Sequence, residues 1–161
     1  MSRRTFFRHF ETKEDLLFVW YEALGRKIVD VCAARPVDES PFDSACAALR
    51  SLLVYYDEDP TWAAAMMKLT AETPGLVAKS LQKRALWEVE LAKVLAPRIG
   101  GRHADIRARV LAATAVNTFA LAVDSWFADA SIDDLHATVD AAFAFASELG
   151  SVAAAANRKP R

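Results

Sequence analysis

The sequence begins with MSRRTFFRHFETKEDLL, residues 1–17, in which three arginines stand within the first eight residues. Ser2 is a favourable N-cap residue, so this pattern predicts a short basic helix over residues 2–9. Thr12, followed by Asp15 three residues later, resembles a capping box and begins a second, amphipathic helix. The three arginines make a local basic patch at the start of a chain whose net charge is only −1.

The composition indicates one domain, or one domain with a small head. The chain has 161 residues, of which 53% are hydrophobic and 25% charged, and it contains only 5 Gly and 6 Pro. This length is enough to bury a sizeable core. The balance of 20 basic against 21 acidic residues argues against nucleic-acid binding over the whole surface, but it permits a local basic patch.

Start and stop signals after residue 12 divide the chain into helices, with no strand-like alternation and no internal repeat. Six helices are expected after residue 12. Three have both ends assigned: one begins at Thr12 and stops before residues 34–41, one runs from about Leu76 to Ile99, and one runs from Ser131 to Gly150. The other three are assigned by their starts alone, at Pro41, about Thr61 and about His103. The segment YYDEDP, residues 55–60, is predicted as a turn. These signals together predict an all-α fold.

The last two helices are apolar on more than one side. Residues 110–123 are nearly all apolar, and a broad apolar stripe follows residues 135–149. Such helices must bury more than one face, which favours a homodimer with a four-helix interface. The alternative is a monomer that encloses its central helix. The predicted interface residues are Val110, Ala113, Asn117, Leu121, Val139, Ala142, Phe143 and Ala146.

A soluble, cytoplasmic protein with no membrane partner is expected. The basic start is followed by FFRHFETKED rather than by the apolar stretch of a secretory signal. The apolar run 110–123 is too short to span a bilayer and ends at Asp124. Cys32 and Cys46 are expected to be half-buried reduced thiols, with a redox pair as the alternative.

With these helices placed, the pattern SRRTFFRHFxTKEDL resembles the recognition helix and following helix of TetR-family transcriptional repressors. The matching residues are Ser2, Thr5, Phe6, His9, Phe10, Thr12, Lys13, Glu14 and Leu16. The resemblance implies a helix-turn-helix head over residues 1–12. It also implies that a homodimer binds double-stranded, palindromic operator DNA.

A recognition helix needs basic and short polar residues at its N-terminal end, where it reaches base edges. Arg3 and Arg4 can pair with guanine, whereas Arg8 is better placed for phosphates. Phe7 departs from the tyrosine usual in the family and lacks its phosphate-binding hydroxyl. The expected DNA-binding residues are Ser2, Arg3, Arg4, Thr5, Phe7, Arg8, His9 and Lys13. The alternative is a solvated basic helix end.

In a TetR-type head, two helices precede the recognition helix, and none precedes Met1 in this sequence. A helix of this length is marginal in water without such a scaffold. We therefore expect the chain as written to bind DNA weakly or not at all, and a longer product to bind it.

The segment LTAETPGLVAKSLQKRALWEVELAKVLAPRIG, residues 69–100, resembles the C-terminal domain of TetR regulators of the acyl-CoA-like ligand-binding, mycofactocin-system group. The resemblance implies a ligand-binding and dimerisation domain over residues 13–150, followed by a flexible tail over residues 151–161. The expected partner is a small apolar or acyl-CoA-like effector, and an acyl-CoA needs an apolar tunnel and cations near its mouth. The expected ligand-binding residues are Trp62, Met66, Met67, Lys83, Arg84, Trp87, Leu91, Asn117, Phe119 and Trp126.

Plainer interpretations of these residues remain. The apolar ones can be ordinary core residues, and Lys83 and Arg84 can belong to a solvated helix surface. Asn117 lies in an apolar helix, where a buried amide needs a partner. That partner can be a ligand or Asn117 of a second copy.

The leading functional hypothesis is a ligand-responsive TetR-type repressor, in which the ligand changes the separation of two DNA-binding heads. The alternative is a dimeric ligand-binding module without DNA activity. An enzyme is not expected, because His136 and Asp140, at i,i+4, lack a third ligand or a nucleophile. No catalytic residue, no metal and no cofactor are expected.

Overall fold

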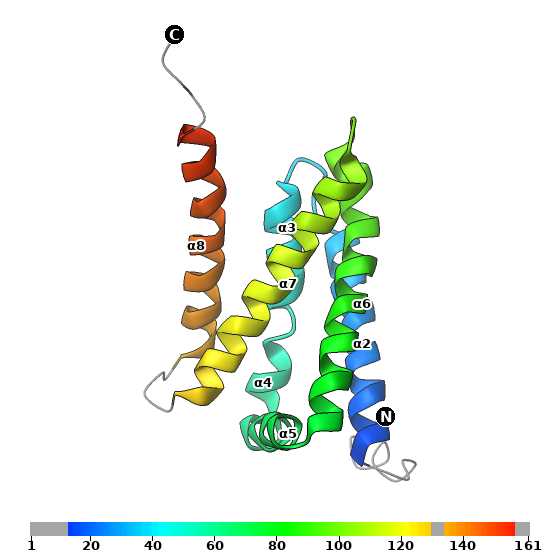
Figure 1. Ribbon diagram of the computed structural model, residues 1–161, viewed down its shortest axis with the longest axis vertical. Coiled ribbons are helices and arrows are strands. Elements are labelled where there is room, and N and C mark those ends of the chain that lie inside the picture. Colours follow the sequence, from blue (N-terminus) through cyan, green and yellow to red (C-terminus); the bar gives the residue numbers. More distant parts are fainter. Residues whose placement is uncertain (1–12, 130–133, 157–161) are drawn as a thin grey trace.

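The computed structural model describes residues 13–129 and 134–156, with side chains described over 20–129 and 134–149. Within these ranges the chain is helical and contains no strand, which confirms the all-α fold (Figure 1). The helices are α2 (Lys13–Ala33), α3 (Pro41–Arg50), α4 (Val54–Glu58), α5 (Pro60–Glu72), α6 (Pro74–Ile99), α7 (Ala104–Ala128) and α8 (Leu135–Ala156). The basic helix predicted over residues 2–9 lies outside the described residues.

Local capping residues explain where several helices begin and end. The Ser40 hydroxyl accepts a hydrogen bond from the backbone N–H of Asp43 at 3.1 Å, and a proline follows it at the first position of α3. The Asp59 carboxylate caps α5 in the same way, accepting from the N–H of Trp62 at 3.0 Å. Gly100, with φ of +59°, ends α6 in a backbone conformation that favours glycine.

Two predicted boundaries are wrong. Residues 54–58 form the short helix α4 rather than a turn, because the N–H groups of Tyr56 and Asp57 donate to the carbonyl of Leu53 before Pro60 interrupts the chain. Helix α8 continues through Gly150 to Ala156. A glycine inside a helix costs only about 1 kcal/mol relative to alanine, and the following alanines at 153–156 are the strongest helix formers.

The start of α8 also differs in detail from the prediction. Ser131, the expected cap, lies outside the described residues. The Asp134 carboxylate accepts a hydrogen bond from the N–H of Ala137 at 3.1 Å, so it stabilises the first turn. The predicted flexible tail 151–161 begins inside α8, and its residues 157–161 are not described.

Helix α7 is the central element of the bundle. It crosses diagonally between α6 and α8 and packs against both of them and against α3 (Figure 1). Its buried face carries Ala108, Ala112 and Ala115, and these small side chains allow neighbouring helices to approach closely. By length and composition alone, this 25-residue helix is able to cross a membrane, so the prediction from residues 110–123 underestimated it. In this structure one side of it packs against α3, α6 and α8, and its other side is exposed.

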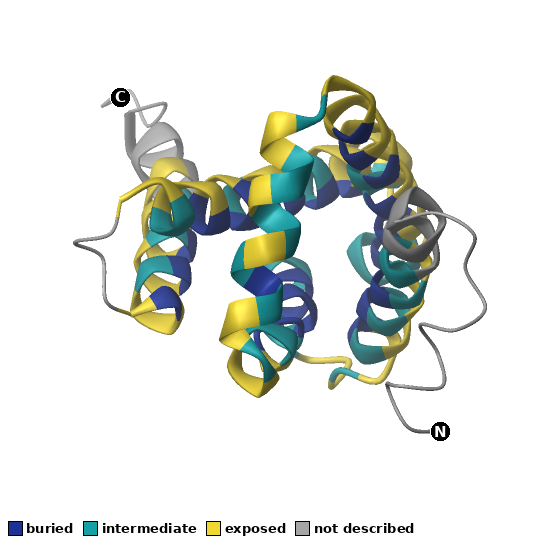
Figure 2. Cartoon of the chain, turned by 90° about the horizontal axis from the view of Figure 1, so that it is seen from below, coloured by how far each residue is buried: buried dark blue, intermediate teal, exposed yellow. Residues whose placement is uncertain are grey.

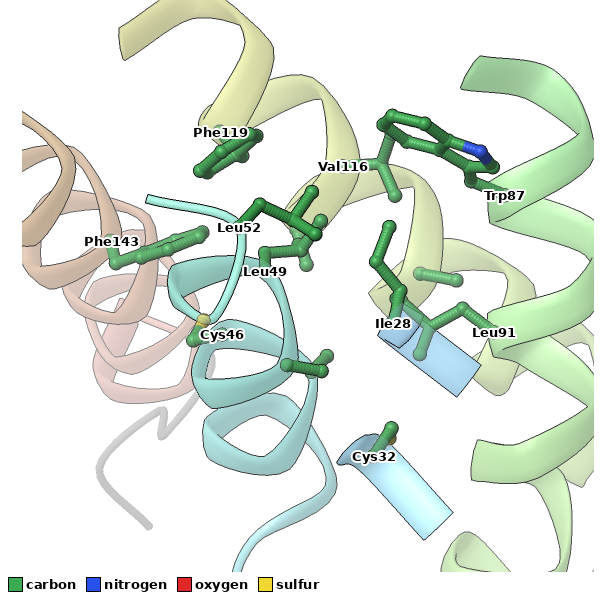
Figure 3. Close-up of a cluster of buried hydrophobic side chains, with 14 of the residues drawn as sticks. Ile28, Cys32, Cys46, Leu49, Leu52, Trp87, Leu91, Val116, Phe119 and Phe143 are labelled. Carbon is green, nitrogen blue, oxygen red and sulfur yellow. The ribbon is translucent and has the colours of Figure 1, made fainter. Parts of the chain in front are cut away.

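The apolar core lies where α2, α3, α6 and α7 meet, and the buried residues face the interior of the bundle (Figures 2 and 3). Ile28, Leu49 and Leu91 are almost completely buried there. Cys32 and Cys46 are free thiols and are fully buried rather than half-buried. Burial raises the pKa of both thiols, that of Cys46 to about 12, so both stay protonated at neutral pH.

A tight contact joins α2 to α6. The Trp87 indole N–H donates a hydrogen bond to the backbone carbonyl of Tyr21 at 3.1 Å. A Cβ atom placed on Gly25 would lie only 2.7 Å from the indole nitrogen. Trp87 therefore packs against bare backbone, and this close approach requires glycine at position 25.

A polar cluster joins the α2–α3 connection to the end of α6. The Arg98 guanidinium donates to the backbone carbonyls of Arg35 and Pro36 and to the hydroxyl of Ser44. Glu39 accepts hydrogen bonds from Arg35 and Ser44, each at 2.8 Å. These bonds, chiefly the one from Arg35, lower the pKa of Glu39 to about 2. The carboxylate is thus ionised wherever the protein is near neutral pH.

Replacing Gly25 by alanine tests the contact between α2 and α6. Gly25→Ala is expected to lower the free energy of unfolding by about 1–3 kcal/mol, because the added methyl group overlaps the indole ring. Gly75→Ala is the matched control, since a Cβ there meets nothing within 4 Å. The control should be neutral or stabilising by up to about 1 kcal/mol, because alanine favours the helix. Urea unfolding followed by circular dichroism measures both, and equal stability of Gly25→Ala and wild type would contradict the required close approach.

Candidate functional site

A cavity of about 490 Å³ opens between α2, α4, α5, α6 and α7. Its volume lies within the range of small-molecule sites. The residues that line it are Trp20, Tyr21, Tyr56, Ala63, Met66, Met67, Thr70, Ala71, Val77, Ser80, Leu81, Arg84, Val123, Asp124, Phe127 and Ala128. Most of these side chains are apolar or aromatic.

Aromatic rings form one wall of the cavity and support one another. Trp20 contacts Tyr21 edge-on, with ring centroids 5.4 Å apart, and contacts Trp62 edge-on at 5.2 Å. Tyr56 packs edge-on against Trp126, with centroids 6.4 Å apart. Such edge-to-face pairs hold the rings in place, so the wall is preformed.

Another part of the wall is flexible and apolar. It contains Met66 and Met67 of α5 and Val77 and Leu81 of α6. Methionine side chains have several rotatable bonds and adapt to irregular apolar shapes. This wall can therefore adjust to the outline of a bound molecule.

An ion pair between α6 and α7 provides the charged part of the lining. The Arg84 guanidinium faces the Asp124 carboxylate, with nitrogen–oxygen distances of 3.3 Å to each of its oxygens. Tyr21 and Tyr56 contribute phenol groups near this pair, and burial raises the pKa of both. Both phenols are accordingly neutral at physiological pH.

The two aliphatic hydroxyls in the lining, those of Thr70 and Ser80, already donate their protons within their own helices. Thr70 donates to the backbone carbonyl of Met66 at 2.9 Å, and Ser80 donates to that of Val77 at 2.8 Å. Their oxygens keep lone pairs, so they offer the cavity hydrogen-bond acceptors.

The cavity brings together part of the predicted ligand-binding set. Met66, Met67 and Arg84 line it directly. Trp87 and Phe119 line a small adjoining space of about 40 Å³ that shares Tyr21, Tyr56 and Arg84 with the main cavity. Trp62 and Trp126 do not line the cavity, but they pack against residues that do: Trp62 contacts Trp20, and Trp126 contacts Tyr56.

Three predicted ligand-binding residues lie elsewhere. Leu91 is fully buried in the core and is not part of the cavity lining. Lys83 faces α2, with its ammonium nitrogen 3.1 Å from the carboxylate of Glu22, because it lies on a different side of α6 from Arg84. Asn117 is exposed rather than buried, and its amide donates to the Glu88 carboxylate at 2.9 Å.

Several lining residues were missed from sequence. Tyr56 was not predicted because it lies in a segment expected to be a turn. Asp124 was used only to mark the end of the apolar run 110–123. Trp20 was assigned to an ordinary apolar stripe, and Phe127 carried no distinguishing signal. None of these residues is recognisable as part of a site until the helices are brought together.

The predicted dimer-interface residues divide into two groups. Val110 and Leu121 expose 57% and 67% of their surface on the outer face of α7, where Asn117 is also exposed and Ala113 partly so. On α8 the prediction needs correction for Val139 and Phe143, which are buried against their own chain.

The apolar stripe of α8 therefore faces inward, against α7 and α3, rather than toward a partner. Ala142 and Ala146 lie at its edge and are partly buried. Among the described residues of α8, the large apolar side chains that are exposed are Phe145 and Leu149 instead.

The expected DNA-binding residues from Ser2 to His9 lie outside the described residues. Lys13 begins α2, and its side chain is not described. The stretch that resembles a recognition helix thus leads directly into the helix that carries Trp20 and Tyr21 of the cavity wall.

His136 and Asp140 do not pair with each other. The His136 ring nitrogen lies 3.0 Å from the Asp57 carboxylate, and Asp140 accepts a hydrogen bond from Arg50 at 2.6 Å. These contacts join α8 to α4 and α3. Over residues 13–129 and 134–156, no group of three or more His, Cys, Asp or Glu side chains is placed to hold a metal ion.

Comparison with known proteins establishes the family. A family model described as the MftR C-terminal domain matches residues 39–149, and the chain belongs to the TetR family of transcriptional regulators, with a C-terminal ligand-binding domain. It is also 30% identical over 137 residues to the HTH-type transcriptional regulator TcmR from Streptomyces glaucescens. That alignment covers 81% of this chain, and the chain spans 61% of the length of TcmR.

Filling the cavity tests whether it binds apolar molecules. We expect the neutral dye Nile red to bind the wild-type chain and Ala71→Trp to weaken binding by at least about tenfold, because the indole occupies the cavity. Ala65→Trp is the matched control, since Ala65 is also exposed on α5 but does not line the cavity. Fluorescence titration measures both dissociation constants, and equal effects of the two substitutions would contradict a site in this cavity.

Proposed function

We propose that the chain is the ligand-binding and dimerisation part of a cytoplasmic, ligand-responsive TetR-type repressor, and that it is not an enzyme. The observation that carries this proposal is the cavity of about 490 Å³ beside α2. Helix α2 directly follows the stretch that resembles a recognition helix. A ligand in the cavity contacts Trp20 and Tyr21 and so acts on the helix nearest to the DNA-binding head.

The proposed response is a shift between two orientations of α2. A ligand that binds one orientation better increases its population. In a dimer, a changed orientation of α2 in each copy alters the distance between the two heads. Operator half-sites have a fixed spacing, so this change weakens binding to DNA.

The proposed homodimer uses the outer faces of α7 and α8. Val110 and Leu121 on α7, with Phe145 and Leu149 on α8, are large apolar side chains exposed to solvent. Exposed apolar residues grouped on neighbouring helices are typical of an interface. Pairing these two helices with those of a second copy forms a four-helix interface.

A charge on this face is expected to disrupt the dimer. Leu121→Glu should convert the protein to its 17.7 kDa monomer, because association would bury an unpaired carboxylate. Val37→Glu is the control: Val37 is 92% exposed in the α2–α3 connection, outside the proposed interface. Sedimentation equilibrium measures the mass of each variant. A wild-type monomer, or a dimeric Leu121→Glu variant, would contradict the proposed interface.

The DNA-binding function is tested by an electrophoretic shift on DNA adjoining the gene, at two salt concentrations. The 161-residue chain is compared with a version extended through any upstream in-frame codons. We expect only the extended form to shift the DNA, and more weakly at the higher salt concentration, because phosphate contacts release counterions. In the extended form, Arg4→Gln should weaken the shift, whereas Arg107→Gln on the exposed surface of α7 should not.

Two other outcomes are informative. A shift by the 161-residue chain itself would overturn the expectation that further helices are needed. If neither form shifts the DNA while both remain dimers, the alternative function, a dimeric ligand-binding module without DNA activity, replaces the repressor.

A further inference from the structure

We infer that the effector of the cavity is an uncharged, flat, ring-containing molecule with a carbonyl or hydroxyl oxygen, rather than an anion such as an acyl thioester of a nucleotide. This inference rests on the proposed function, because it assigns a ligand class to the same cavity.

The first observation is the charge of the lining. Among the described residues that line the cavity, Arg84 and Asp124 are the charged ones, and they neutralise each other at 3.3 Å. An anion that approaches Arg84 must displace or lie beside the Asp124 carboxylate. Either arrangement places two negative charges close together at the rim of the cavity, where the Asp124 side chain is 52% exposed.

The second observation is the position of the other nearby cations. Lys83 is only 7% exposed and pairs with Glu22 in the groove between α2 and α6, away from the cavity. Lys79 is exposed on α6 and is not part of the lining. A phosphate-bearing ligand needs several charge-assisted hydrogen bonds, and this lining provides one guanidinium that is already paired.

The third observation is the shape and polarity of the walls. Trp20, Tyr21, Tyr56 and Phe127 present aromatic surfaces to the cavity. Rings pack well against such surfaces, stacked or edge-on. The phenols of Tyr21 and Tyr56 are neutral hydrogen-bond donors, and they suit a carbonyl or hydroxyl oxygen on the ligand.

One neutral and one anionic dye separate the possibilities. Nile red is neutral and carries a ring carbonyl, whereas 8-anilinonaphthalene-1-sulfonate carries a full negative charge. Titration of the whole 161-residue chain with each dye gives two dissociation constants. We expect the wild-type cavity to bind Nile red at least about tenfold more tightly than the sulfonate, because of the repulsion by Asp124.

Removing the negative charge should change this preference. In Asp124→Asn, the Arg84 guanidinium is unpaired, so the ratio of the sulfonate to the Nile red dissociation constant should fall by about tenfold. Asp105→Asn is the control, since it removes the same charge from the exposed first turn of α7. In the control, the ratio should remain that of the wild type.

The outcomes distinguish this inference from the proposed function. Binding signals that disappear in Ala71→Trp come from the cavity. If the wild-type cavity binds the sulfonate as tightly as Nile red, or Asp124→Asn leaves the ratio unchanged, the uncharged class is overturned and the ligand-binding function stands. If Ala71→Trp affects neither dye, the cavity is not a binding site, and the proposed function falls with the inference.

Discussion

The contact of the Trp87 ring with the bare backbone at Gly25 sets the distance between α2 and α6. The indole N–H donates a hydrogen bond to the Tyr21 carbonyl, and the absence of a side chain at Gly25 leaves room for the ring to approach the backbone. Because α2 and α6 are held close at this point, Ile28 and Leu91 meet in the core on one side of it. On the other side, the same contact brings Tyr21 to the cavity wall.

Next to this tightly packed contact, the helices leave a cavity. A well-packed bundle loses stability wherever it leaves space, so a large cavity lined by aromatic rings supports the proposed binding role. Around it, α6 and α7 are joined by the Arg84–Asp124 pair, and α8 is joined to the body by Arg50. The Arg84–Asp124 pair is itself part of the lining, so the contact that joins α6 to α7 also gives the cavity its charged edge.

Much of the fold was predictable, because helix ends depend on neighbouring residues. Ser40, Pro74 and Gly100 mark boundaries through capping, proline and glycine, and the structure places helix ends at these residues. The inward face of α8 was harder to predict. Alanine and phenylalanine occur on more than one side of this helix, so periodicity alone did not show that Phe143 packs inward and Phe145 faces solvent.

The sequence alone specifies the helical class, most helix boundaries and the motif that places the chain among TetR regulators, because each is encoded by residues close together in the chain. Only the tertiary structure decides which charges meet. Arg84 and Asp124 are 40 residues apart, and Glu22 and Lys83 are 61 apart. Lys83 and Arg84 are neighbours in sequence, yet a helix turns about 100° per residue, so one faces α2 while the other faces the cavity. The adjacent cations therefore have different partners, and among the described lining residues the charge of Arg84 is balanced by that of Asp124.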